Sequence, residues 1–175
     1  MSINTVLKSE RLDAALEYAR AGLPVLPLRR KIPLTKHGVK DATRDEAQIT
    51  EWWTRWPDAN IGLATGQVSG WLVLDVDIKN GKRGDESLRA LIEEHGPLPK
   101  TRHNVTATGG SHYVLRIMPG QKVKSRNGVR EGLDLLSDGK YFVAPPSTID
   151  GVAYRWTESC EAAPCPPWVA ALGER

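Results

Sequence analysis

The stretch Trp71-Leu72-Val73-Leu74-Asp75-Val76-Asp77 is an apolar run that ends in two carboxylates. Turn residues bound it on both sides, which is typical of a short buried strand. Side chains two residues apart on a strand share a face, so Asp75 and Asp77 are expected to project together. Paired carboxylates repel each other, and a divalent cation with oxygen ligands would offset that repulsion. Each Asp could instead pair with a Lys or Arg, or face water.

The composition is that of an ordinary globular protein. The chain has 175 residues, 26% of them charged and 40% hydrophobic, which suffices for one domain with a core. No apolar run reaches the roughly 20 residues of a membrane helix, and residues 1–11 lack the apolar segment of a signal peptide. Cys160 and Cys165 are too few for a disulfide framework or a zinc site. We therefore expect one cytoplasmic domain that does not bind membranes.

The net charge of +3 is spread unevenly. One basic cluster consists of Arg29, Arg30, Lys31, Lys36 and Lys40, and a second of Lys122, Lys124, Arg126 and Arg130. Such clusters are often only solvated surface. They are also the residue types that contact phosphates, so both clusters are candidate nucleic-acid or nucleotide contacts.

Periodicity and turn residues predict alternating helices and short strands. The expected helices cover residues 10–21, 43–56 and 85–95, with a short one near 168–172. The expected strands cover residues 24–28, 60–65, 71–77, 104–108, 111–117, 132–136, 141–144 and 152–156. Prolines in the first strand indicate a sheet edge, because proline cannot donate to a ladder.

Two helices carry specific signals. Ser9 is the expected N-cap of the first helix, and Thr43 that of the second. Ile49, Trp52 and Trp56 share one face of the second helix. We interpret this face as core, with base stacking by the tryptophans as the alternative.

The connections in the second half also carry signals. Residues 118–131 are polar, basic and contain glycine, which predicts a long mobile loop. The turn Ser137-Asp138-Gly139-Lys140 is typical of a hairpin, because Asp-Gly tolerates positive φ. Residues 141–144 are therefore expected to pair with residues 132–136.

A third carboxylate lies on another predicted strand. Asp134 stands between Leu133 and Leu135, and a carboxylate on such an apolar strand needs a cation, a donor or a metal ion. Together with Asp75 and Asp77 it supplies three carboxylates from two strands. Two-metal phosphoryl transfer uses such a set to hold two ions about 4 Å apart.

The turn Thr108-Gly109-Gly110-Ser111-His112 is a candidate phosphate contact. Two glycines allow close approach of the backbone, whose N–H groups can face an anion. His112 and Arg116 share a strand face and could donate to phosphate oxygens. The turn could equally be a plain hairpin connection, and His112 a partly buried histidine or half of an ion pair.

The order of these motifs resembles a known family. Asp-Val-Asp, Gly-Gly-Ser-His, Leu-Asp and Tyr-Phe-Val-Ala-Pro-Pro-Ser follow one another as in the bifunctional primase-polymerase (prim-pol) domain of the archaeo-eukaryotic primase superfamily. Upstream segments at residues 31–33, 40–43 and 56–62 are also similar, so the resemblance spans about residues 14–156. It implies an α/β (α+β) fold in which an N-terminal unit (about 10–70) packs on an RRM-like module (71–156), with a catalytic cleft between two sheets and a tail at 157–175.

The resemblance also implies roles for residues. The metal ligands would be Asp75, Asp77 and Asp134, and His112 would contact the phosphates of the incoming nucleotide. Gly110 stands where the wider superfamily more typically has Ser. The remaining nucleotide contacts would be Lys31, Lys40, Thr108, Gly109, Gly110, Ser111 and Arg116.

The implied activity is template-directed nucleotidyl transfer by a DNA primase/polymerase. Its substrates would be NTPs or dNTPs with Mg²⁺ or Mn²⁺, and its partners a single-stranded DNA template and primer contacted by Lys122, Lys124, Arg126 and Arg130. The domain would be monomeric and would work with a helicase domain or helicase protein. The resemblance implies a setting in the replication of plasmids, phages or mobile elements. The alternatives are a two-metal nuclease, which uses water as nucleophile, and a non-catalytic nucleic-acid-binding module.

Overall fold

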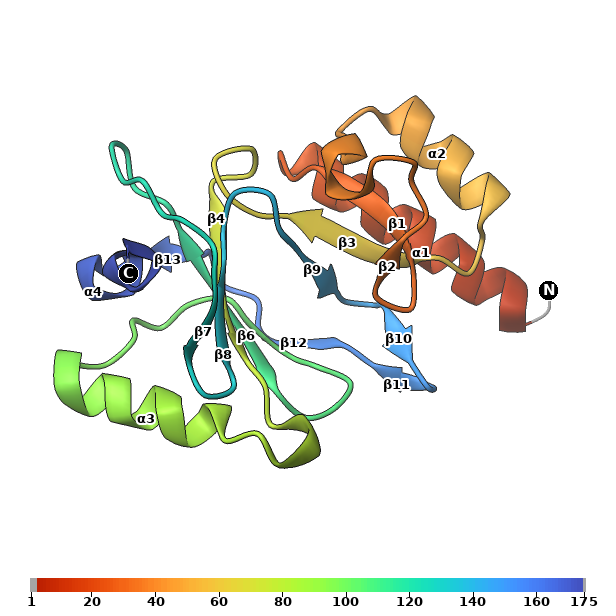
Figure 1. The fold of residues 1–175 in the computed structure, drawn as a ribbon. Coiled ribbons are helices and arrows are strands. Elements are labelled where there is room, and N and C mark those ends of the chain that lie inside the picture. Colours follow the sequence, from red (N-terminus) through yellow and green to blue (C-terminus); the bar gives the residue numbers. More distant parts are fainter. Residues whose placement is uncertain (1–2, 175) are drawn as a thin grey trace.

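The computed structural model describes residues 3–174 and has a mixed α+β architecture (Figure 1). The helices are α1 (Ile3–Arg20), α2 (Glu46–Arg55), α3 (Gly84–His95) and α4 (Pro167–Ala171), with 3-10 turns η1 (Gly38–Asp41), η2 (Lys79–Gly81) and η3 (Leu172–Glu174). The strands are β1 (Val25–Arg29), β2 (Ile32–Pro33), β3 (Asn60–Ala64), β4 (Trp71–Val76), β5 (His103–Val105), β6 (Ser111–Arg116), β7 (Arg126–Arg130), β8 (Leu133–Leu136), β9 (Tyr141–Ala144), β10 (Thr148–Ile149), β11 (Val152–Ala153), β12 (Arg155–Glu158) and β13 (Ala163–Pro164).

Two sheets organise these elements. The N-terminal sheet has the strand order β2-β1-β3-β9 and is antiparallel throughout. The central sheet has the order β12-β5-β6-β4-β8-β7, and β13 runs parallel beside β6. A small hairpin, β10-β11, stands apart from both. The strand that begins at Trp71 therefore lies inside the central sheet, between β6 and β8.

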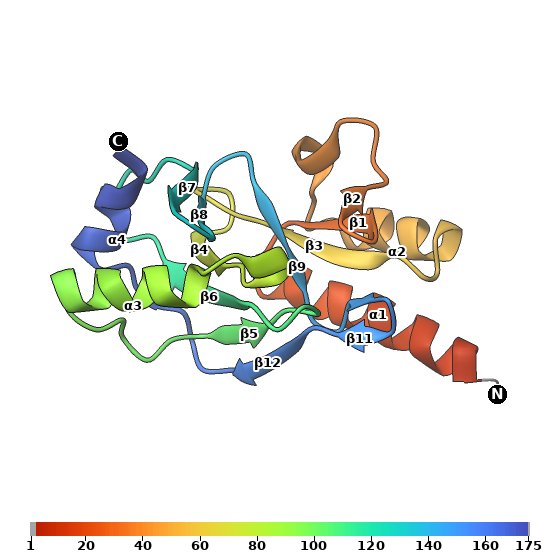
Figure 2. The same cartoon turned by 60° about the horizontal axis from the view of Figure 1, so that its bottom comes forward.

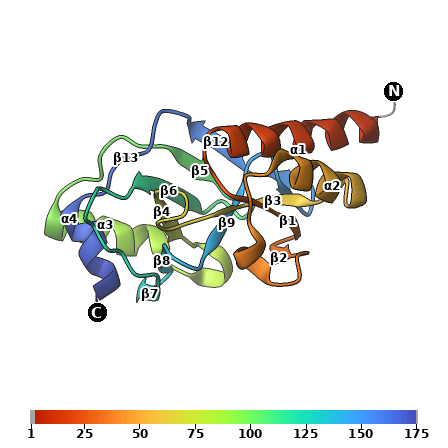
Figure 3. The same ribbon diagram turned by 90° about the horizontal axis from the view of Figure 1, so that it is seen from above.

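Helices cover one face of each sheet. Helices α1 and α2 lie side by side against the N-terminal sheet (Figure 3), where Ile49 and Trp53 enter the core. Helices α3 and α4 lie at the opposite end of the molecule (Figure 2) and pack on the central sheet. The other face of the central sheet joins the first core through Val73 and Val114. It is therefore turned toward the N-terminal unit.

The expectation that the first strand lies at a sheet edge is wrong. Strand β1 pairs with β3 on one side and with β2 on the other. The carbonyl of Pro27 accepts a hydrogen bond from the N–H of Leu34 at 3.0 Å, beyond the two-residue strand β2. The missing N–H of Pro27 points to that same side, where β2 is too short to need a donor.

Both predicted N-caps are corrected. Helix α1 begins at Ile3, so Ser9 lies inside it. Asp45 caps α2 by accepting a hydrogen bond from the N–H of Ala47, whereas Thr43 pairs with Val25 in a bridge. Competing backbone pairing with the sheet thus moves the helix start by two residues.

The buried face of α2 also differs from the prediction. Ile49 and Trp53 are the buried residues of the helix, and the indole N–H of Trp53 donates to the carbonyl of Ala59 at 3.1 Å. Trp52 and Trp56 are only partly buried and pack around that core. The predicted core face is therefore correct for Ile49, whereas Trp53 takes the buried place predicted for Trp52 and Trp56.

The predicted hairpin at residues 137–140 is wrong. Strand β9 leaves the central sheet and pairs with β3 of the N-terminal sheet. Thr65 holds the turn there, because its N–H donates to the carbonyl of Lys140 at 2.9 Å and its hydroxyl donates to the carbonyl of Ser137 at 2.6 Å. The turn connects two sheets.

The predicted loop at residues 118–131 is only partly a loop. Its second half forms β7, an edge strand that pairs with β8 through Arg126 opposite Leu135 and Arg130 opposite Leu133. The register shifts between these two pairs: five residues of β7 run beside three residues of β8, and only the two end residues of β7 are paired. This bulged edge explains why the polar sequence shows no strand alternation.

Candidate functional site

Four polar side chains form a row across the central sheet. Asn104 on β5 is directly opposite His112 on β6, His112 is opposite Asp75 on β4, and Asp75 is opposite Asp134 on β8. Directly opposite residues of antiparallel strands share a face. Asp75 and Val73 share a face, so this polar row is turned toward the N-terminal sheet. The structure thus brings Asp75, His112 and Asp134 together.

Asp77 follows directly after β4 and lies two residues from Asp75. Its N–H donates to the carbonyl of Gly132 at 2.8 Å, which continues the ladder toward β8. Gly84 and Gly132 enclose this strand end, since a Cβ at either would approach the carbonyl oxygen of Asp77 to 2.7 Å. Close backbone packing therefore fixes the position of the second carboxylate.

The Asp77 carboxylate is already engaged by cations and an amide. It accepts hydrogen bonds from the N–H of Lys79 and from Nζ of Lys82, each at 2.9 Å. Burial disfavours its charge, but the hydrogen bonds from Lys82 and Lys79 and the charges of Lys82 and Lys31 outweigh burial, and its pKa is lowered. Lys31 thus influences the site from the β1–β2 connection.

Lys82 is the cation nearest to the carboxylates. The hydrogen bond to Asp77 and the charge of Asp77 raise its pKa, with further contributions from Asp134 and Asp75. Sequence reasoning missed this residue. The signal available was its position in the loop that follows the acidic strand.

His112 is enclosed beside Asp75. Its Nε2 lies 3.4 Å from Oδ1 of Asp75, and its side chain is 7% exposed. Phe142 approaches the imidazole edge-on with ring centroids 5.4 Å apart, and Tyr154 stacks near it at 6.2 Å. Burial and the charges of Asp75 and Asp77 raise the pKa of Tyr154 to about 12. Tyr154 was also missed, because only the tertiary fold brings residues 142 and 154 to this row.

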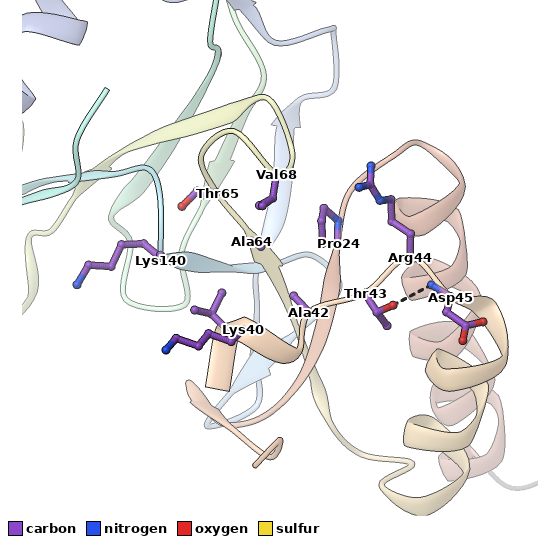
Figure 4. Close-up of a pocket in the computed structure, with 12 residues that line it drawn as sticks. Pro24, Lys40, Ala42, Thr43, Arg44, Asp45, Ala64, Thr65, Val68 and Lys140 are labelled. Carbon is purple, nitrogen blue, oxygen red and sulfur yellow. Dashed lines mark hydrogen bonds between the residues drawn. The ribbon is translucent and has the colours of Figure 1, made fainter. Parts of the chain in front are cut away.

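Lys40 lines a different part of the molecule. It belongs to a cavity of about 530 Å³ at the end of the N-terminal sheet, and none of the three carboxylates lines this cavity. Figure 4 shows Lys40 and Lys140 extending to the same side, while the Arg44 guanidinium points away from them. Arg44 donates to the carbonyl of Gly22 at 3.2 Å. Lys140 was not expected, because its role depends on the inter-sheet turn.

The structure does not bring Arg116 to the carboxylates. Arg116 is opposite Trp71, whereas His112 is opposite Asp75. Four residues of strand separate them, roughly 13 Å. The Arg116 guanidinium lies 3.5 Å from the Met118 sulfur. Arg116 and His112 do share a strand face, as predicted, but Arg116 lies four residues further along β6 and therefore away from Asp75.

The glycine turn is a local connection. The N–H of Gly109 donates to the carbonyl of Thr106 at 3.0 Å, so that amide is not free for an anion. The Thr108 hydroxyl lies 3.3 Å from the Thr106 hydroxyl, and Ser111 pairs with Val76. A Cβ at Gly110 would lie 2.4 Å from the carbonyl oxygen of Val76. Gly110 therefore allows the turn to pack beside the end of β4.

The second basic cluster is divided by its contacts. Arg130 makes two hydrogen bonds to Glu94 of α3, at 3.0 and 3.3 Å, and Arg126 donates to the carbonyl of Leu172. Lys122 and Lys124 are exposed. The arginines thus anchor β7, and the lysines remain at the surface.

No group of three His, Cys, Asp or Glu side chains within residues 3–174 is arranged to hold a metal ion. Asp77 contacts Lys82, and Asp134 accepts a hydrogen bond from the N–H of Gly128 at 2.7 Å. The donor chemistry nevertheless suits a hard divalent cation, because Asp75 and Asp134 are directly opposite on paired strands and Asp77 follows directly after β4. The residues fit such an ion if the Asp77 carboxylate gives up its hydrogen bond from Lys82 and binds the ion instead.

Neighbouring carboxylates that suit a divalent cation, with a lysine beside them, suit chemistry on phosphate groups. The family model described as bifunctional DNA primase/polymerase, N-terminal, matches residues 15–168, and the chain belongs to this Prim-Pol family. Membership indicates primase or polymerase activity in general, which is nucleotidyl transfer. Comparison with curated proteins gives no match. No helix within residues 3–174 is long and apolar enough to cross a membrane.

Proposed function

We propose that this domain extends or initiates nucleic-acid strands from NTPs or dNTPs on a single-stranded DNA template. The observation that carries the proposal is the direct pairing of Asp75 with Asp134, in a chain that the Prim-Pol model matches almost throughout. Like charges directly opposite each other destabilise a sheet, so their placement needs a compensating function. The finer fold assignment, an N-terminal unit on an RRM-like module, belongs to the same proposal.

Asp75, Asp77 and Asp134 are the proposed ligands of Mg²⁺ or Mn²⁺. When bound, two such ions would stabilise charge on the attacking and leaving oxygens of the transfer. The chain's own residues prepare this site: the β4–β8 pairing fixes two carboxylates, and close packing at Gly84 and Gly132 fixes the third. When a metal ion takes the place of Lys82 at Asp77, the Lys82 ammonium becomes available to a phosphate oxygen.

The nucleotide contacts come from two sides. His112 presents Nε2 beside Asp75 and would donate to phosphate oxygens. Lys31 approaches from the N-terminal sheet, and Lys40 and Lys140 line the cavity at its end. We assign the cavity to phosphates of the nucleotide or primer, and the exposed Lys122 and Lys124 to the template backbone. Salt-sensitive binding is the expected consequence.

The test is nucleotide incorporation on primed and unprimed single-stranded DNA, with each NTP and dNTP set under Mg²⁺ and then Mn²⁺. Asp75→Ala and Asp134→Ala are compared with the parent and with Asp85→Ala, an exposed carboxylate on α3. We expect both site variants to be nearly inactive and Asp85→Ala to match the parent. Near-parental incorporation by either site variant would refute the assignment.

A second measurement separates metal binding from activity. Mn²⁺ titration followed by electron paramagnetic resonance should show bound ion in the parent and weaker binding in Asp75→Ala and Asp134→Ala. Release of nucleotides without added triphosphate would favour a nuclease. Template binding that ignores both metal and nucleotide would favour a non-catalytic binding module. A helicase is a further proposed partner, which co-purification of a purified helicase with this chain would test.

A further inference from the structure

Unpaired buried polar atoms lie side by side at one end of the polar row. The Asn104 side chain is fully buried, and among the described residues neither its Oδ1 nor its Nδ2 has a hydrogen-bond partner. Nδ1 of His112 is also buried and unpaired there. A buried polar group without a partner destabilises the fold. Such groups in neighbouring positions need an explanation.

The pairing of β5 and β6 places these groups next to each other. Asn104 is directly opposite His112, on the same face of the central sheet. The Cβ atoms of directly opposite residues are about 4.5–5.5 Å apart, which is within reach of an amide and an imidazole. The imidazole also contacts Asp75 and the rings of Phe142 and Tyr154. Asn104 is therefore the polar neighbour of His112 on the β5 side, as Asp75 is on the β4 side.

The contact with Asp75 decides which ring nitrogen carries the hydrogen. Nε2 of His112 faces a carboxylate oxygen at 3.4 Å, and a carboxylate only accepts hydrogen bonds. This contact favours the tautomer with hydrogen on Nε2, because a ring lone pair facing a carboxylate would be repelled. In the neutral ring Nδ1 is then an acceptor, which requires a donor. The amide Nδ2 of Asn104 is a donor without a partner. The two atoms do not form a hydrogen bond in the structure, so the bond requires an adjustment of one of the two side chains.

We propose that Asn104 is a positioning residue that donates from Nδ2 to Nδ1 of His112. This hydrogen bond fixes the tautomer with hydrogen on Nε2 and aims that N–H at Asp75 and at a substrate phosphate beside it. The part that concerns the phosphate rests on the proposed function. The side-chain pairing stands independently of it.

The direct test is ¹⁵N NMR of the His112 imidazole at pH 9, in the complete chain. The parent should show hydrogen on Nε2 and a through-space contact between the Asn104 amide hydrogens and the His112 ring. Hydrogen on Nδ1, or no such contact, would overturn the proposal. This measurement needs no variant and no activity.

Two substitutions then separate positioning from packing. Asn104→Leu keeps the size but removes the donor, and should give a mixture of tautomers. Asn104→Asp replaces the donor by an acceptor and should move the hydrogen to Nδ1. Thr101→Val removes a buried hydroxyl bonded to Val114 and Ala163, and should leave the His112 tautomer unchanged. A parent-like His112 spectrum in Asn104→Leu would contradict the inference.

Kinetics give a separate readout. Asn104→Leu should raise the KM for the nucleotide about tenfold, in line with losses of residues that orient a functional histidine. Thr101→Val should leave KM unchanged even if it lowers stability. If the parent incorporates no nucleotide, the proposed function fails, while the tautomer result still decides the role of Asn104.

Discussion

The two faces of the central sheet use the same strands for different purposes. On β4, Leu72 and Leu74 point toward α3 and α4 and are fully buried, whereas Asp75 lies on the opposite face beside His112. On β8, Leu133 and Leu135 flank Asp134 in the same alternation. The helix-covered face stabilises the domain, whereas the face turned toward the N-terminal sheet carries like charges that lower its stability.

The contrast shows that the pairing register of β4 with β6 and β8 keeps the carboxylates on the face turned toward the N-terminal sheet. A slip of one residue in a strand would exchange its two faces and would place carboxylates against α3 and α4. Burying an unpaired charge costs a large amount of free energy, whereas the apolar burial that it would replace stabilises the fold. The apolar face therefore fixes the positions of Asp75 and Asp134 without contacting any substrate. The predictions below test this division.

The largest expected effect is the loss of activity in Asp75→Asn. Metal-assisted charge stabilisation contributes several kcal/mol, so incorporation should fall by about 10³-fold. The melting temperature should stay the same or rise, because a like charge opposite Asp134 is removed. Primer-extension rates and calorimetry measure the two effects. A variant that is both inactive and strongly destabilised would instead indicate a structural role.

On the other face, Leu74→Ala should cost about 2–5 kcal/mol of unfolding free energy, because the side chain is fully buried. Urea denaturation measures this change. Activity per folded molecule should remain close to that of the parent, in contrast to Asp75→Asn. Val68→Ala serves as control, since Val68 is 56% exposed, and should change stability by less than about 0.5 kcal/mol.

A smaller effect is expected at the cavity. Lys40→Met and Lys140→Met should each weaken nucleotide binding by up to about fivefold, the range of an exposed charge contact of about 1 kcal/mol. The loss should shrink as salt is added. Lys100→Met is the matched control, because Lys100 is an exposed residue near Glu158 and does not line the cavity. Equal losses in all three variants would argue against a specific site.

The effect that is smallest at neutral pH is a pH dependence that emerges only at high pH. The pKa of Tyr154 is raised by burial and by the charges of Asp75 and Asp77 to about 12, from an ordinary value of 10. Its contribution to stability is therefore complete below pH 10 and is lost as pH rises toward 12. Phenolate absorbance should show that Tyr154→Phe removes a late-titrating tyrosine. Burial also raises the pKa of Tyr18 to about 12, so the step of Tyr154 is taken as the difference from Tyr154→Phe. Asp75→Asn should move this difference to lower pH, and an unchanged difference would contradict the proximity.

Local sequence patterns determined much of this protein. Alternation along residues 71–77 placed the carboxylates on one strand, and the ordered motifs indicated the family that the model match confirms. The patterns suffice because the side that a residue faces depends only on its own strand. The pairing of β9 with β3, the bulged strand β7 and the distance of Arg116 from Asp75 were decided by tertiary structure. Asn104 and Tyr154 join the site only through strand pairing and ring packing with His112, which no local periodicity encodes. Lys82, in contrast, contacts Asp77 five residues away in the chain.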